Sequence, residues 1–223
     1  MRYIKRPKNS DAPQSFKKWL KKRPFAKYSN FGNTRIKNEL KNSLVARQSY
    51  LCCYCESRIF AQTSHIEHIE PQFGGASEKT LEYSNMAASC IKEPKKQNGK
   101  PAFTAESALH CGHARGTHTV ASPYDPLCER LFEYSFSGEI RPNSTLTNPD
   151  EKELAINSIG YLKLNVPSLV VARKIAITES IRLYLNGTKP EKILGKLNYK
   201  LIPFWSAAKF AINELVKRRA QKA

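Results

Sequence analysis

Histidine and cysteine are concentrated in one part of this 223-residue chain. All five histidines and five of the six cysteines lie between Cys52 and His118. Thiolate and imidazole are the side-chain groups that bind zinc and related metals, and imidazole also titrates near neutral pH. Because a random distribution would not gather them in under a third of the sequence, this window constrains the fold more than any other feature. It predicts a metal-dependent site.

Four cysteines of the window predict a structural zinc ion. Cys52 and Cys55 have the C-x-x-C spacing, at which two sulfurs can share one tetrahedral zinc. Zinc then needs two more ligands, and Cys90 and Cys111 are the obvious thiols left. The alternative is a set of reduced thiols packed in the core. Two further cysteines are expected to take no part, namely Cys53 and Cys128.

The pattern between the cysteines predicts a short strand and a helix. Residues 64–69 predict a strand, because Ile66 and Ile69 flank polar residues. A glycine turn at residues 74–75 follows. A helix is then predicted from Ser84, its expected N-cap, to residue 90. Cysteine pair, strand, turn, helix and a final Cys-Gly-His run are typical of a ββα-metal finger.

Most of the remaining chain is predicted to be helical. Helices are expected over residues 15–22 and 34–49, and further helices from Asn148, Pro167, Pro190 and Pro203, with a loop at 91–103 and a β-hairpin at 131–140. The fold class is therefore α+β, a ββα-metal finger embedded in a mainly helical chain. Three segments are predicted: a basic arm and helix (1–50), the finger with its zinc site (51–142), and a helical region packed on it (143–223).

The net charge of +18 is concentrated at the two ends of the chain. Residues 1–50 carry an excess of +12 and residues 189–223 an excess of +7, whereas the middle is near neutral. Such an excess favours a polyanionic partner such as DNA or RNA, although a merely solubilising surface has the same composition. The strongest cluster of candidate phosphate contacts is Lys17, Lys18, Lys21 and Lys22. Phe16 and Trp19, which lie among them, either stack on bases or anchor the arm to the core.

The sequence shows no sign of export or membrane insertion. No apolar run approaches the roughly 20 residues of a spanning helix, and the basic N-terminal stretch is not followed by an apolar one. We therefore expect a cytoplasmic protein with no membrane partner. In a reducing compartment the cysteines predict zinc binding and not disulfides.

The motifs of the window resemble those of HNH endonucleases with a structural zinc. Over residues 1–142 the chain looks like the HNH nuclease component of Septu-type and retron-associated antiphage defence systems. The runs that carry the likeness are Met1-Arg2-Tyr3-Ile4-Lys5-Arg6, Cys52-Cys53-Tyr54-Cys55, His65-Ile66-Glu67-His68-Ile69-Glu70-Pro71, Cys111-Gly112-His113-Ala114-Arg115-Gly116 and Ser122-Pro123-Tyr124-Asp125-Pro126. Residues 143–223 match only loosely.

The resemblance implies two catalytic residues. His68 corresponds to the general base that activates water against a phosphodiester. Asn85 corresponds to the asparagine of the family name and is expected to orient the loop or the His68 ring. A helix cap is the plainer explanation of Asn85.

The resemblance also implies a catalytic Mg²⁺ or Mn²⁺ ion. Glu67 stands where the family often has aspartate, and its carboxylate is a hard ligand suited to these ions. His113 is the expected second ligand, with His110 and His118 as competitors. His65 lies two residues from Glu67 and shares its face of a strand, so it is either a further ligand or a hydrogen-bonding support. Arg115 is a candidate phosphate clamp.

Two functions from different classes follow. The first is a metal-dependent endonuclease that hydrolyses DNA or RNA. The resemblance implies that it is the effector of a bacterial antiphage defence system regulated by a partner ATPase, with a reverse transcriptase or retron complex as a further partner. The second is a zinc-stabilised nucleic-acid-binding or adaptor protein whose HNH site is inactive. The complete set of Glu67, His68, Asn85 and His113 favours the first.

Overall fold

The computed structural model describes residues 1–71, 77–90, 96–97, 100–101 and 109–221. The expected glycine turn at 74–75 and most of the expected loop at 91–103 lie outside the described residues. The helices are α1 (Gln14–Lys21), α2 (Thr34–Arg47), α3 (Gly112–Arg115), α4 (Pro149–Tyr161), α5 (Pro167–Leu185), α6 (Pro190–Leu194) and α7 (Trp205–Ala220). The strands are β1 (Ser64–His68), β2 (Met86–Cys90), β3 (Lys96–Gln97), β4 (Lys100–Pro101), β5 (Phe132–Tyr134) and β6 (Ile140–Pro142). The fold class is α+β, as predicted.

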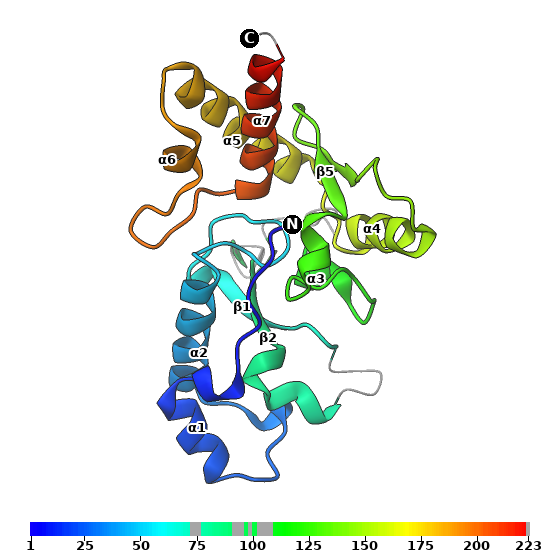
Figure 1. The fold of residues 1–223 in the computed structure, drawn as a ribbon. Helices are drawn as coiled ribbons and strands as arrows, with labels where there is room; N and C mark the ends of the chain where they lie inside the picture. Colours follow the sequence, from blue (N-terminus) through cyan, green and yellow to red (C-terminus); the bar gives the residue numbers. More distant parts are fainter. Residues whose placement is uncertain (72–76, 91–95, 98–99, 102–108, 222–223) are drawn as a thin grey trace.

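An antiparallel pair of strands, β1 and β2, lies at the centre of the chain (Figure 1). Their register places Ser64 opposite Cys90 and His68 opposite Met86. Helix α2 packs against both strands, and its N-terminus is capped by Asn33, whose side chain accepts a hydrogen bond of 3.1 Å from the backbone N–H of Ile36. The predicted strand at 64–69 and the predicted helix at 34–49 are confirmed within two residues.

The predicted helix from Ser84 to residue 90 is wrong. Tyr83–Asn85 is a single 3₁₀ turn, and Met86–Cys90 is strand β2. All five side chains of β2 are buried, so the sequence lacks the alternation of apolar and polar residues by which a strand is recognised. Its alanines favour a helix locally, but pairing with β1 overrides that preference. The described strands and helix of the window therefore follow the order β1, β2, β3, β4, α3.

Helix α1 is anchored on α2 by its aromatic side chains. Phe16 is fully buried and Trp19 is 9% exposed, and both rings contact Phe31. Burial leaves neither ring a free face for a nucleobase, so the anchoring alternative is the one the structure supports. The lysines of α1 lie on the other faces: Lys18, Lys21 and Lys22 are exposed, whereas Lys17 is half-buried.

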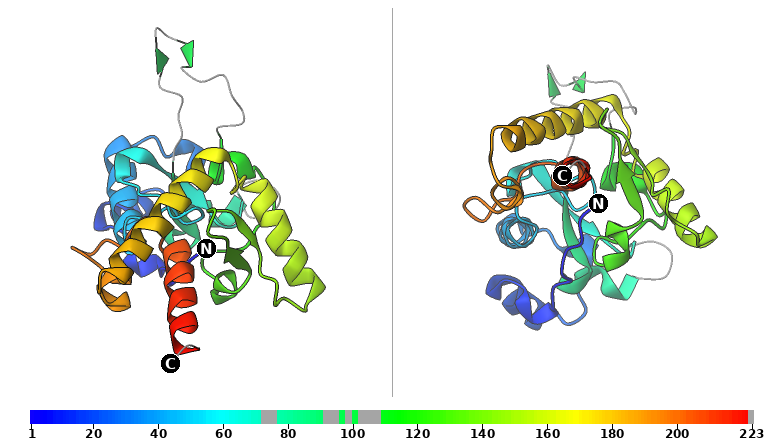
Figure 2. Two further views of the ribbon diagram at one scale, coloured as in Figure 1. Left: turned by 90° about the horizontal axis from the view of Figure 1, so that it is seen from above. Right: turned by 45° about the horizontal axis from the view of Figure 1, so that its top comes forward.

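The C-terminal helices begin close to the predicted prolines. Asn148 caps α4 by accepting hydrogen bonds from the backbone of Asp150 and Glu151, and α5 ends before Gly187, which has φ +85°. Helix α7 begins at Trp205 instead of Pro203, after the left-handed Phe204. Helices α5, α6 and α7 lie at one end of the molecule (Figure 1), and further views show the N-terminus beside α7 (Figure 2).

Backbone and side-chain contacts join the C-terminal helices to the central window. Glu56 accepts hydrogen bonds from the backbone N–H and the hydroxyl of Ser206, at 2.7 and 2.6 Å. The N–H of Cys111 donates to the carbonyl of Leu162 at 2.8 Å. One apolar cluster includes residues of all three predicted segments, and the division into those segments stays a prediction. Within the described residues, no helix is both long and apolar enough to cross a membrane.

Candidate functional site

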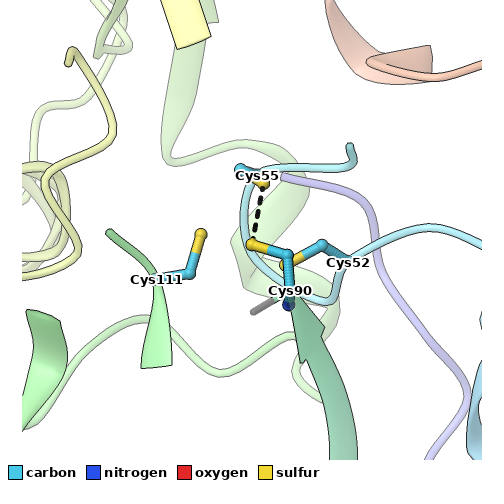
Figure 3. A group of neighbouring side chains, drawn as sticks. All are labelled: Cys52, Cys55, Cys90 and Cys111. Carbon is cyan, nitrogen blue, oxygen red and sulfur yellow. Dashed lines mark hydrogen bonds between the residues drawn. The ribbon is translucent and has the colours of Figure 1, made fainter. Parts of the chain in front are cut away.

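Four cysteine side chains converge from three separate places in the sequence (Figure 3). Cys52 and Cys55 come from the turn after α2, Cys90 ends β2, and Cys111 precedes α3. The four sulfur atoms all lie within 4.8 Å of one another, are buried, and form no disulfide. Cys90 ends β2, whose pairing with β1 places it near the turn. There the N–H of Cys90 donates to the sulfur of Cys52 at 3.3 Å.

The spacing of these sulfurs suits a tetrahedral metal. With Zn–S bonds of about 2.3 Å, two sulfurs of a tetrahedron lie about 3.8 Å apart. The sulfurs of Cys55 and Cys90 are 3.8 Å apart. His110 lies beside the cluster, with its Nδ1 at 3.1 Å from the sulfur of Cys111 and 3.6 Å from that of Cys90. Four thiols in this arrangement fit a structural zinc ion, and His110 is placed to support them.

A second group of polar side chains surrounds Glu67 on β1. Oε2 of Glu67 lies 3.2 Å from Nε2 of His65, and the His65 and His113 ring centroids are 4.4 Å apart. Nδ1 of His65 is buried and has no hydrogen-bond partner among the described residues. A carboxylate oxygen and two imidazoles, one of them with this unpaired nitrogen, are a donor set that fits a divalent cation. The predicted ligands Glu67, His65 and His113 are therefore neighbours.

The Glu67 group is less compact than the cysteine cluster. Among the described residues, the four cysteines are the one set of three or more His, Cys, Asp or Glu ligand atoms gathered within 4.8 Å. His113 is exposed at the start of α3, whereas Glu67 is 8% exposed. His113 is thus placed beside the Glu67–His65 pair, not in a closed ligand set with it.

Glycine at position 112 allows α3 to approach this group. A Cβ atom on Gly112 would lie 2.2 Å from Oε2 of Glu67 and 2.5 Å from Nε2 of His65, far inside contact distance. Any larger residue would displace the two side chains from the N-terminus of α3. The glycine of the Cys-Gly-His run therefore has a packing reason that the sequence did not reveal.

Arg115 is a buried partner of Glu67. Its side chain is 3% exposed, and Nη1 donates to Oε1 of Glu67 at 2.8 Å, to the hydroxyl of Tyr54 at 2.9 Å and to the carbonyl of His68 at 2.9 Å. Nη2 donates to the carbonyl of Ile69 at 2.6 Å. The guanidinium is buried and engaged with β1, which does not favour contact with a phosphate at the surface, and the phosphate-clamp role of Arg115 stays a prediction.

The contacts of Glu67 favour its ionised form. Burial alone would raise the pKa of Glu67, but the hydrogen bond from His65 and the charge of Arg115 lower that pKa overall. The hydroxyl of Tyr54 also donates to Oε1, at 3.0 Å. Oε1 is thus held by Arg115 and Tyr54, while Oε2 faces His65 and α3. The structure brings in Tyr54, which sequence reasoning missed although it stands inside the C-x-Y-C run.

His68 points away from Glu67, because neighbouring residues of a strand face opposite sides. Its Nε2 lies 2.9 Å from the carbonyl of Thr80, and its ring meets the edge of Tyr28 at a centroid distance of 4.5 Å. A carbonyl can only accept, so Nε2 carries the hydrogen and Nδ1 is the basic nitrogen of the neutral ring. Burial lowers the pKa of His68, so the ring is neutral at pH 7.

Asn85 holds the loop that supplies the partner of His68. Its Oδ1 accepts from the N–H of Glu70 at 2.8 Å, and its Nδ2 donates to the carbonyls of Glu70 and Lys79 at 3.1 and 3.3 Å. Thr80, the acceptor for His68, follows Lys79 directly. Asn85 precedes a strand, so it caps no α-helix, and its orienting role stays a prediction that these contacts support.

The other predicted residues lie apart from both groups. His118 is exposed and stacks on Tyr161, with ring centroids 3.8 Å apart. Lys17, Lys18, Lys21 and Lys22 lie on and just after α1, at the opposite end of the molecule from α7 (Figure 1). Nζ of Lys17 donates to the carbonyl of Ser10 at 2.9 Å. Nucleic-acid binding by these lysines stays a prediction.

Comparison with known proteins gives one informative relative. No protein-family model matches the chain. A protein of Vibrio cholerae serotype O1 biovar El Tor, named "Retron Vc95 putative HNH endonuclease", is 31% identical over 176 residues, which cover 75% of this chain and 80% of the relative. Such identity over most of both sequences, together with the motifs placed above, establishes homology. The chain therefore belongs to the HNH endonuclease family and is related to a retron-associated member of it.

Proposed function

We propose that this protein is a metal-dependent endonuclease that hydrolyses phosphodiester bonds in nucleic acid. The observation that carries the proposal is the fixed tautomer of His68. The Thr80 carbonyl holds the hydrogen on Nε2, and burial keeps the ring neutral near pH 7. A neutral imidazole of defined tautomer is the group that a general base requires.

In the proposed reaction, Nδ1 of His68 accepts a proton from the water that attacks the phosphorus. Asn85 holds the backbone at Glu70 and Lys79, and with it the adjacent Thr80 carbonyl, in place behind the ring. That carbonyl stabilises the imidazolium formed when the proton is taken up, because it accepts from Nε2–H. The leaving 3′ or 5′ oxygen then takes a proton from solvent.

The Glu67 group would hold the catalytic ion. Oε2 of Glu67 and the imidazoles of His65 and His113 are the proposed ligands, and a bound divalent cation would neutralise charge on the leaving oxygen. Two imidazoles make this set softer than an all-oxygen site. We therefore expect Mn²⁺ to support activity better than Mg²⁺, which prefers oxygen ligands. Arg115 and Tyr54 keep Glu67 ionised and oriented toward α3.

The biological setting is proposed from the relative. Because the related Vibrio protein is named for a retron, we propose that this chain also serves in a retron-like or Septu-type antiphage defence system. A partner ATPase and a reverse transcriptase complex, as well as a cytoplasmic location, are part of this proposal. Regulation by a partner would keep a nuclease from cutting the nucleic acid of its own cell.

One observation favours the second function, a nucleic-acid-binding or adaptor protein with an inactive site. Oε1 of Glu67 is engaged by Arg115 in a buried ion pair, and His113 stands outside a closed ligand set. If the ion pair satisfied the carboxylate completely, a cation would gain little there. The endonuclease would cleave nucleic acid and would need His68 to do so, whereas the adaptor would bind nucleic acid without cleaving it.

The test compares His68→Ala with the wild-type chain. Both proteins are incubated with single- and double-stranded DNA, with RNA and with tRNA, in Mg²⁺ or Mn²⁺, alone and with any protein that co-purifies from the native operon. We expect His68→Ala to lower the cleavage rate by roughly 10²–10⁴-fold, because a proton acceptor is lost. Added Mn²⁺ is not expected to restore it.

The matched control is His118→Ala, which removes an exposed histidine outside both groups. This variant should cleave as the wild type does. Zinc content and circular dichroism of both variants should match the wild type. Full activity of His68→Ala would refute the role of His68, and absence of cleavage by the wild type under every condition, with nucleic-acid binding retained, would favour the adaptor function.

A further inference from the structure

Helix α5 has apolar residues on two opposite sides, but only one side is covered. Leu169 and Ile177 are buried, and α5 packs against α7. Val171 and Ile175 are 56% and 64% exposed. A helix that is apolar all round is typical of one that is covered on more than one side. The exposed side of α5 is therefore a candidate contact surface.

Ile175, at the edge of this side, helps to line an apolar groove of about 410 Å³, of which α5 forms one wall. Helix α6 and residues 202–204 complete it. The apolar lining residues are Ala172, Ile175, Ala176, Leu183, Ile193, Ile202, Pro203 and Phe204. Outside the lining, in the turn that follows α6, Leu197 and Tyr199 are 77% and 85% exposed. Large apolar side chains gathered at an exposed groove mark a site for another molecule.

The surroundings of the groove are basic. Lys192 adjoins the lining residue Ile193 in sequence, and Lys189 and Lys196 flank α6. These three lysines are exposed, and none forms an ion pair within the part of the chain that the structure describes. The exposed acid among them is Glu191. The acidic lining residue Glu179 is paired with Arg182 at 2.7 Å. The net field at the groove is therefore positive.

Charge and polarity together select one kind of occupant. A second copy of this chain would bring a net charge of +18, including the same excess at residues 189–223, so the two groove faces would repel each other. Nucleic acid would match the lysines but not the apolar walls. An amphipathic helix with aliphatic residues at i, i+3, i+4 and i+7 and acids on its flanks matches both.

We propose that the α5–α6 groove binds an acidic amphipathic helix of a partner protein. The aliphatic face of that helix lies against Ile175 and Phe204, and its acidic flanks face Lys192 and Lys196. The proposal does not depend on the nuclease activity, because the groove shares no residue with the cysteine cluster or the Glu67 group.

The test uses two fluorescein-labelled peptides and the full-length chain. One peptide is a helix with leucine at i, i+3, i+4 and i+7 and glutamate on its flanks, and the other has lysine in place of every glutamate. Fluorescence anisotropy should show that the acidic peptide binds and that the basic one binds at least about tenfold more weakly. Ile175→Asp, and separately the pair Lys192→Glu and Lys196→Glu, should each weaken the acidic peptide by about tenfold or more.

The control is Ile156→Asp on α4, which replaces another exposed isoleucine, 52% exposed, away from the groove lining. It should leave binding unchanged. Equal binding of both peptides, no binding of the acidic one, or an acidic peptide unaffected by Ile175→Asp would each overturn the proposal. Sedimentation velocity tests whether a second copy of the chain occupies the groove. If the wild type is a dimer and Ile175→Asp dissociates it, the groove binds a second copy and the proposal is wrong.

Discussion

At the scale of single residues, the candidate base His68 and the candidate metal ligand Glu67 differ in what sequence could reveal. The motif indicated His68, but its partner is the Thr80 carbonyl, a backbone group that no residue type encodes. The positively charged partner of Glu67 is Arg115. The sequence singled out Arg115, but as a residue that would contact phosphate. Only the close approach of α3 to β1, which Gly112 permits, places that guanidinium in the interior.

The structure predicts that Arg115→Ala is strongly destabilising. Removal of the guanidinium leaves the Glu67 carboxylate buried without its ion pair and frees the carbonyls of His68 and Ile69. Breaking a buried ion pair in this way costs about 3–5 kcal/mol of unfolding free energy. Urea denaturation measures this cost.

Arg35→Ala is the control for Arg115→Ala, because Arg35 is 89% exposed in its pair with Glu39. An exposed pair of this kind is worth about 1 kcal/mol or less. If Arg115→Ala were as stable as Arg35→Ala and lost only affinity for nucleic acid, the phosphate-clamp role would be supported.

At the scale of secondary structure, the sequence predicted the elements whose ends are set by nearby caps, prolines and turn residues. Asn33 and Asn148 cap their helices, prolines begin α4, α5 and α6, and the Ser-Gly turn precedes β6. Strand β2 was missed because its partner β1 lies far back in the sequence, and because full burial removes the alternation. That pairing matters for the metal, since it carries Cys90 to the Cys52–Cys55 turn.

The cysteine cluster predicts one tightly bound zinc ion per chain. Cys90→Ser should lose that zinc and much of the folding free energy, because metal binding in such sites is coupled to folding and is worth about 10–16 kcal/mol in small zinc modules. Metal analysis by mass spectrometry and circular dichroism of the purified variant test this.

Cys128→Ser provides the matched control for Cys90→Ser. Cys128 is also buried but lies outside the cluster, so this variant should keep its zinc. Loss of zinc in both variants would mean that general unfolding causes the loss. A Cys90→Ser protein that keeps both fold and zinc would exclude the cysteine site.

At the scale of the whole molecule, the basic excess of the sequence resolves into two surfaces of different character. The lysines on and just after α1 lie beside a pocket of about 230 Å³ that Phe16, Lys17 and Leu20 help to line, and Phe25 is 94% exposed. The lysines around α6 flank the larger α5–α6 groove. Composition revealed the charge at both ends of the chain, but where the larger groove forms depends on how the C-terminal helices pack.

The lysines of α1 are predicted to bind nucleic acid through its phosphates. Lys18, Lys21 and Lys22 are exposed, whereas the ammonium of Lys17 is engaged by the carbonyl of Ser10. Reversal of the three exposed charges to glutamate should weaken binding to duplex DNA and lower the slope of log K against log salt by about 2–3, since each phosphate contact contributes about 0.9. The comparison variant reverses Lys189, Lys192 and Lys196, three exposed lysines that we assign to a protein partner. It changes the net charge equally, so a smaller loss of DNA affinity there would show that position matters and not charge alone. Equal losses in the two variants would mean that the basic ends act only as a diffuse field.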